Sequence, residues 1–403
     1  MERLFSVQVF VNMSCLKVLS LPALRTTLLT EDIALYALGV PTTRALSISL
    51  LPKAKILRER IEPGAIVARF AESWLRIGTF DLLRARGERD MIRKLATFIA
   101  EDVFAGWESL PAAVSLGEEH SPVNVGSPPK GIAWDEVQDH QGVQENRFAR
   151  LYREIARRNA KTVAAWQAYG FMNGVLNTDN TSIYGLSIDY GPFAFMDNFD
   201  PQYTPNHDDH LLRYSYKNQP TVIWWNLVRL GESLGELIGA GDRVDEDGFV
   251  NEGLTEEAAE PVIKLAENII ERTGQEFRSV FLREYKCLMG RRLGLRSQKE
   301  SDFQSLFSEI LDTLEALELD FNQFFRRLSQ ISLAEIDTDE KRKEVAPIFF
   351  HTEGFGGIGY TEDSAKDRIG KWLGQWHSRI MEDWGSGNDE ERQKAMKSVN
   401  PKV

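Results

Sequence analysis

The sequence predicts an α+β protein in which a small β-containing part precedes a larger, mostly helical part. Two runs rich in small and branched apolar residues, 41–51 (PTTRALSISLL) and 64–71 (GAIVARFA), are typical of β-strands. From 88–104 (ERDMIRKLATFIAEDVF) onward, apolar residues recur with the helical period. We therefore expect two domains, residues 1–82 and residues 83–403, with the strands in the first.

Within the helical part, two long helices and two irregular segments are expected. Residues 145–171 predict an amphipathic helix, and residues 221–238 predict another that follows Pro220. Pro, Gly and Ser are frequent near 109–143, which predicts a loop insertion. The acidic segment 239–253 (GAGDRVDEDGFVNEG) is interpreted as a linker.

Composition excludes several classes of protein. The chain has 403 residues, 42% of them hydrophobic, so it can bury a large core. Its formal net charge of −12 argues against a general nucleic-acid binder and leaves room only for a local basic pocket. The two cysteines, Cys15 and Cys287, provide neither a disulfide framework nor a cysteine zinc site.

The apolar N-terminal segment 4–24 (LFSVQVFVNMSCLKVLSLPAL) has three interpretations. It is a buried strand with a turn, an organelle-targeting segment or a signal-like segment. Asn12 and Lys17 in its middle argue against a membrane span, so we expect no integral membrane helix.

The segment 174–192 (GVLNTDNTSIYGLSIDYGP) contains the strongest chemical signal. Asp179 and Asn180 lie in a polar turn, and Asp189 follows a short apolar run that resembles a strand. Phosphoryl and nucleotidyl transfer need oxygen ligands for Mg²⁺ and a carboxylate near the attacking hydroxyl. The pattern predicts such groups on adjacent turns of a hairpin, with Gly191 permitting a sharp turn. The alternative is that the same residues only form turns and caps.

Arg69 and Arg76 are candidate phosphate ligands. Arg69 lies among apolar residues of an expected strand, where an unpaired guanidinium is costly, and Arg76 follows in SWLRIG. Two guanidiniums could hold a terminal phosphate through bidentate hydrogen bonds. The alternative is an exposed edge strand or ion pairing with Glu72 and Asp81.

Two further motifs are interpreted as loops. Residues 206–210 (NHDDH) resemble a metal cluster, but without ligands from a second element a polar loop is favoured. Residues 354–359 (GFGGIG) fit a dinucleotide fingerprint, but no βαβ pattern surrounds them. We therefore expect a glycine turn before a helix that begins near Thr361.

The segment 174–192 and its surroundings closely resemble the selenoprotein O (SelO) family. The resemblance covers the chain from about Tyr36 to its C-terminus and is specific, because the combination TDN…IDYGPF is not a general kinase string. It is carried by four segments: 37–48 (ALGVPTTRALSI), 64–81 (GAIVARFAESWLRIGTFD), 174–209 (GVLNTDNTSIYGLSIDYGPFAFMDNFDPQYTPNHDD) and 213–230 (RYSYKNQPTVIWWNLVRL).

The resemblance implies a protein-kinase-like fold, with an incomplete β-containing N-lobe and a mostly helical C-lobe that carries a catalytic hairpin at 173–192. Members of the family transfer AMP from ATP to Ser, Thr or Tyr hydroxyls of proteins, and ATP binds reversed relative to ordinary kinases. The reaction uses Mg²⁺ or, as an alternative, Mn²⁺. The implied location is mitochondrial, with a cytoplasmic location as the alternative.

The resemblance also implies a role for each candidate residue. Asp179 would be the catalytic general base for the accepting hydroxyl. Asn180 and Asp189 would hold the metal, and Arg69 and Arg76 would hold the terminal phosphate of the nucleotide.

The chain departs from the family pattern in its N-terminal region and at position 173. Nothing resembles the phosphate-positioning lysine in a QLKGAGRTPYSR-like string, and Glu31 does not fit the register of its glutamate partner. Asn173 stands where many members have His. The chain thus resembles a SelO protein shortened at both ends. Two alternatives to AMP transfer remain open: an inactive pseudokinase or interaction module, and a Mg²⁺-dependent kinase that transfers the γ-phosphate.

Overall fold

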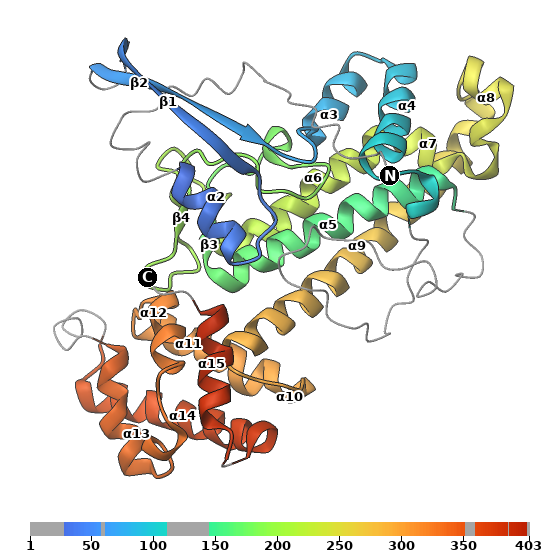
Figure 1. Ribbon diagram of the computed structural model, residues 1–403. Helices are drawn as coiled ribbons and strands as arrows, with labels where there is room; N and C mark the ends of the chain where they lie inside the picture. Colours follow the sequence, from blue (N-terminus) through green and yellow to red (C-terminus); the bar gives the residue numbers. More distant parts are fainter. Residues whose placement is uncertain (1–27, 58–60, 111–144, 351–358, 386, 401–403) are drawn as a thin grey trace, which may run out of the picture.

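The computed structural model describes residues 28–57, 61–110, 145–350, 359–385 and 387–400. These residues form an α+β structure that is mostly helical, with two small two-stranded sheets, β1–β2 and β3–β4 (Figure 1). The fold class expected from the sequence is confirmed at this level.

Strands β1 (Arg44–Leu57) and β2 (Ile61–Phe70) form the larger sheet, an antiparallel pair. Both expected strands are therefore confirmed, although each extends further toward the other than the apolar pattern predicted. The pair projects from one end of the molecule beside helix α2 (Leu28–Ala37) (Figure 1). Several of its apolar side chains remain exposed, among them Leu46 at 68% and Leu50 at 51%.

Most of the rest of the described chain is helical. The helices of more than seven residues in this part are α3 (Ile77–Ala85), α4 (Arg89–Phe98), α5 (Arg147–Tyr169), α6 (Gln219–Ser233), α9 (Glu256–Arg292), α11 (Glu309–Ala316), α12 (Phe321–Leu328), α14 (Glu362–Trp384) and α15 (Asp389–Val399). The shorter ones are α7 (Gly235–Gly239), α8 (Asp247–Glu252), α10 (Glu300–Asp302) and α13 (Asp339–Val345).

Helix α5 is the centre of the helical part, packed along α6 and the long helix α9. Asn146 caps its N-terminus by accepting from two backbone N–H groups, and Gly170 ends it in the left-handed conformation. The expected helix is confirmed, and its polar face proves to be buried as well as its apolar face. Every residue from 151 to 169 is buried, because neighbours surround the helix on all sides. Its charged residues are paired, as when Arg157 Nε donates to Glu276 Oε1 at 2.6 Å.

The interpretation of 239–253 as a linker is wrong. This segment forms a 3₁₀ turn and helix α8, which buries Phe249. Arg89 of α4 donates to the Phe249 and Val250 carbonyls and so fixes the C-terminal end of this short helix.

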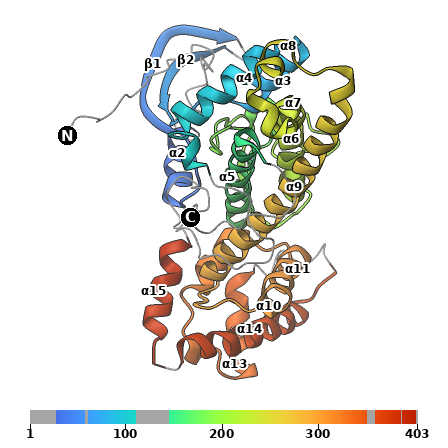
Figure 2. The same cartoon turned by 90° about the vertical axis from the view of Figure 1, so that its right-hand side faces the viewer.

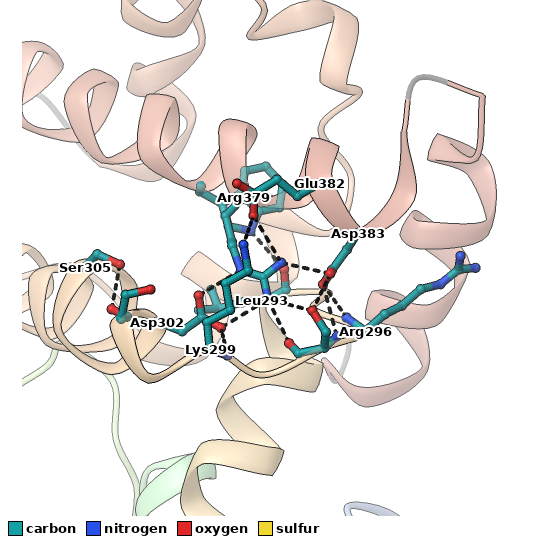
Figure 3. Close-up of polar contacts among 11 residues, drawn as sticks. Leu293, Arg296, Lys299, Asp302, Ser305, Arg379, Glu382 and Asp383 are labelled. Atoms are coloured by element: carbon teal, nitrogen blue, oxygen red, sulfur yellow. Dashed lines mark hydrogen bonds and ion pairs between the residues drawn. The ribbon is translucent and has the colours of Figure 1, made fainter.

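Helices α10 to α15 form a second helical group, joined to the first by the length of α9 (Figure 2). Trp376 of α14 is buried and its Nε1 donates to the Leu293 carbonyl at 2.9 Å. On the same helix, Arg379 Nε donates to Asp302 Oδ1 at 2.8 Å and its Nη1 lies 2.9 Å from Asp383 Oδ1 (Figure 3). These bonds lock α14 against the turn that follows α9.

Three expectations fall wholly or largely outside the described residues: the apolar segment 4–24, the loop insertion near 109–143 and most of the glycine motif 354–359. The helix expected after that motif is confirmed, since Thr361 caps α14. In the described part of the chain, no helix has the length and apolarity needed to cross a membrane.

Candidate active site

The loop that carries Asp179, Asn180 and Asp189 leaves the helical core between strands β3 (Phe171–Met172) and β4 (Ala194–Phe195). These strands pair antiparallel and close the base of the loop. Phe171 also packs against Phe193 and Phe195, so aromatic contacts support the pairing.

The short strand expected between Asp179 and Asp189 is not present. Ser182 instead forms a single antiparallel bridge with Arg76, and Ser187 forms a single parallel bridge with Thr42. The apolar run therefore pairs with the N-terminal part of the chain rather than with its own loop, which connects the loop to the residues around β1 and β2.

Asp179 and Asn180 lie on a 3₁₀ turn, Thr178–Asn180. Asn180 Nδ2 donates to the Val175 carbonyl at 2.9 Å. Thr181 Oγ1, directly after the turn, donates to the Asn177 carbonyl at 3.0 Å. The Asp179 side chain is exposed and has no hydrogen-bond or ion-pair partner among the described residues. The turn is thus held by its neighbours, and its carboxylate is left free for other chemistry.

Asp189 is held through its backbone by Asn173. Asn173 Nδ2 donates to the Asp189 carbonyl at 2.8 Å, and the Asn173 N–H donates to Gln219 Oε1 at 3.1 Å. Both amide side chains are buried. The asparagine that departs from the family pattern supplies an N–H donor, as a histidine ring could.

One hydrogen-bonded path joins the two predicted metal ligands. Asn180 bonds the Val175 carbonyl, the Val175 N–H lies 3.4 Å from Asn173 Oδ1, and Asn173 bonds the Asp189 carbonyl. Asn173 was not identified from the sequence as a link between these two residues. Gln219, which accepts from the Asn173 N–H, lies in segment 213–230, which was named only for its resemblance to the SelO family.

Arg69 reaches this loop from β2. Its Nε and Nη2 donate to Thr43 Oγ1 at 3.1 and 2.6 Å, and Nη2 also donates to the Ile188 carbonyl, next to Asp189. Its guanidinium lies 4.9 Å from the ring centroid of Tyr190. The alternative partner Asp81 lies instead 3.5 Å from an Arg229 nitrogen.

Arg76 lies at the start of α3. The Ile77 N–H donates to the Thr181 carbonyl at 3.0 Å, which fixes the Arg76 backbone beside the loop. Its half-buried side chain has no hydrogen-bond or ion-pair partner among the described residues. A half-buried guanidinium whose N–H groups have no such partner is suited to binding an anion.

The donor set fits Mg²⁺. The bond from Asn180 Nδ2 leaves the Asn180 amide oxygen without a hydrogen-bond partner among the described residues, and Asp189 adds a carboxylate. Mg²⁺ takes hard oxygen ligands, commonly one or two protein groups with phosphates and waters. No cluster of three or more His, Cys, Asp or Glu suited to a metal occurs in the described ranges, and a site of this kind does not need one.

Two other polar features adjoin this loop, since Asn206 Nδ2 donates to the Gly174 carbonyl at 3.1 Å and β4 lines part of a cavity. Residues 206–210 form a turn in which Asp209 accepts from the Arg213 and Tyr214 N–H groups. An acid-lined cavity of about 750 Å³ lies beyond β4. Its lining residues are Ala194, Phe195, Met196, Asp197, Asn198, Phe199, Asp200, Tyr203, Glu315 and Glu318, and none is a predicted site residue.

Fold and site together define an α+β protein with a loop of oxygen donors beside two arginines. A family model described as protein adenylyltransferase SelO matches residues 19–403. The chain therefore belongs to the SelO family.

Curated relatives agree with this assignment. The chain is 38% identical over 373 residues to a Schizosaccharomyces pombe protein named "Protein adenylyltransferase SelO, mitochondrial", covering 91% of this chain and 58% of that protein. The Saccharomyces cerevisiae protein of the same name is 37% identical, covering 73% and 47%. A Cupriavidus metallidurans "Protein nucleotidyltransferase YdiU" is 31% identical, covering 92% and 55%. The chain spans about half the length of these relatives.

Proposed function

We propose that this chain is a protein adenylyltransferase that transfers AMP from ATP to Ser, Thr or Tyr hydroxyls of proteins with Mg²⁺ bound. In this proposal the fold is protein-kinase-like, with residues 1–82 as a partial N-lobe and residues 83–403 as the C-lobe. The names of the two yeast relatives support both the activity and a mitochondrial location. The observation that carries the proposal is the hydrogen-bonded path from Asn180 to Asp189, next to the guanidinium of Arg69.

Each residue has a distinct part in the proposed reaction. The acceptor hydroxyl oxygen attacks the α-phosphorus, the bond to the β-phosphate oxygen breaks and pyrophosphate leaves. Asp179, exposed and without a protein partner among the described residues, accepts the hydroxyl proton. Arg69 and Arg76 hold phosphate oxygens by charge-assisted hydrogen bonds.

Asn180 and Asp189 would hold Mg²⁺ through their side-chain oxygens. Bound there, the metal would neutralise charge that develops on the phosphates. The path through Asn173 ties the Asn180 side chain to the backbone of Asp189, so we expect little reorganisation of this loop when nucleotide binds.

ATP labelled separately at the α- and γ-phosphates tests this proposal directly. The purified chain is incubated with each label, Mg²⁺ and casein as a generic acceptor, and protein-bound label is counted. AMP transfer puts α-label on protein, whereas label from the γ position alone would establish a kinase and refute the proposal. No label from either position would favour an inactive pseudokinase or interaction module.

Asp189→Ala tests the metal role. We expect α-label to fall by at least about 100-fold, because an electrostatic group at the reacting phosphate is removed. Asp208→Ala, which removes an exposed carboxylate on the nearby turn, should leave labelling unchanged. Thermal unfolding measured by circular dichroism should be similar for both variants. Undiminished label with Asp189→Ala would refute the metal role.

A further inference from the structure

Gly78, the second residue of helix α3, lies directly against Asp179. A Cβ atom at position 78 would lie 2.9 Å from Asp179 Cγ and 3.2 Å from its backbone nitrogen, and it would overlap Oδ1. Gly78 has an ordinary helical backbone rather than a positive φ, so its conformation alone does not require glycine. The close approach of the carboxylate is the feature that excludes a side chain.

The backbones of α3 and of the 178–180 turn are held together. Ile77 and Phe80 anchor the first turn of α3 in the core with no exposed surface. The Ile77 N–H donates to the Thr181 carbonyl at 3.0 Å, which ties α3 to the residue after the 178–180 turn. With both backbones fixed, a side chain at position 78 would have to displace the Asp179 carboxylate by rotation about χ1.

We propose that Gly78 is a positioning residue for Asp179, and that its missing side chain sets the direction in which the carboxylate points. This inference rests on the proposed role of Asp179. The start of a helix is also a place where a nearby negative charge is generally tolerated. A larger residue at position 78 would preserve the fold and ATP binding but would turn the proton acceptor away from the acceptor hydroxyl.

Gly78→Ala tests the inference, and Gly248→Ala is its matched control. Gly248 is likewise the second residue of its helix, α8, but a Cβ atom added there would meet nothing within 4 Å. We expect Gly78→Ala to lower kcat for α-label transfer to casein by about 100-fold, since displacing a reacting group by about 1 Å can cost this much. KM for ATP should change by less than about 3-fold, because Arg69 and Arg76 are untouched. Gly248→Ala should leave both constants unchanged.

Asp179→Ala separates this inference from the proposed function. If Gly78 acts through Asp179, the double variant Gly78→Ala/Asp179→Ala is as slow as Asp179→Ala alone. A full rate with Asp179→Ala would refute the proposed role of Asp179. A full rate with Gly78→Ala, when Asp179→Ala is inactive, would overturn only the positioning role of Gly78. The same conclusion would follow if the rate of the double variant fell by the product of the two single-variant losses.

A crystal structure of Gly78→Ala gives a readout independent of turnover. We expect the Asp179 carboxylate to be rotated while the backbones of α3 and the 178–180 turn keep their positions. An unmoved carboxylate would overturn the inference. If Gly78→Ala does not fold, the double variant with Asp179→Ala should fold, because the overlapping carboxylate is gone; failure of both to fold would overturn it as well.

Discussion

The β1–β2 pair and helix α5 contribute to the same candidate site but differ sharply in how they are held. Every residue from 151 to 169 of α5 is buried, whereas Leu46 and Leu50 of β1 are more than half exposed. The loop of Asp179 and Asp189 is fastened to α5, because Asn159 Nδ2 donates to the Ser182 carbonyl at 3.0 Å and Trp166 Nε1 donates to Ser187 Oγ at 2.8 Å. Arg69 lies instead on the pair with the exposed side chains. The comparison teaches that a site can combine a rigid half with a half that opens more easily, since local stability follows local burial.

A pair of leucine substitutions measures this difference and has the largest expected effect. Leu151→Ala, in α5, should lower the free energy of unfolding by about 2–5 kcal/mol, because it leaves a cavity at a fully buried site. Leu46→Ala should change it by less than about 0.5 kcal/mol, because the side chain is 68% exposed. Urea unfolding followed by circular dichroism measures both. Equal costs would mean that the outer face of β1 is covered in solution.

Arg69→Met tests the more exposed half through function. We expect KM for ATP to rise by roughly 10- to 100-fold, because charge-assisted hydrogen bonds to phosphate are lost. Arg44→Met is the matched control, since Arg44 lies on the paired strand with its guanidinium over the Tyr36 ring. Label transfer measured against ATP concentration gives KM for ATP for each of the two variants. An equal rise in KM for the control would assign the loss to distortion of the strand pair rather than to phosphate binding.

The spacing of apolar residues predicted the main helices and the first two strands, because in these long segments the apolar residues repeat with one period. It missed α8, whose single buried aromatic, Phe249, lies in an acidic segment and depends on Arg89 from a distant helix. It also placed a strand between Asp179 and Asp189 that is absent, because Ser182 and Ser187 pair with residues far away in the chain.

The roles of the candidate site residues came from resemblance and remain predictions. The structure adds why they lie together: Thr43 and Ile188 bring Arg69 to the loop, and Asn173 links the two predicted metal ligands. No local pattern predicts the bonds from Arg69 to Thr43 and Ile188, or the bond from Asn173 to the Asp189 carbonyl, since these groups are separated in sequence. The need for glycine at position 78 is hidden for the same reason, because it arises only where α3 meets Asp179.

The second helical group offers a test by pH. Partial burial would raise the pKa of Asp383, but hydrogen bonds from Ser297 and Arg379 outweigh it and lower the pKa to about 2 (Figure 3). The ionised form is therefore favoured by folding. Its contribution is complete above the unfolded pKa, near 4, and is lost as the pH falls toward 2.

Asp383→Asn should thus cost about 1–3 kcal/mol at pH 7, because an acceptor of several hydrogen bonds loses its charge. The difference from the unsubstituted chain should shrink between about pH 4 and pH 2, measured by urea unfolding across that range. Glu382→Gln, on the exposed side of the same helix, should cost less than about 1 kcal/mol. A difference for Asp383→Asn that stays constant down to pH 2 would show that the charge on Asp383 does not stabilise the junction between α14 and the turn after α9.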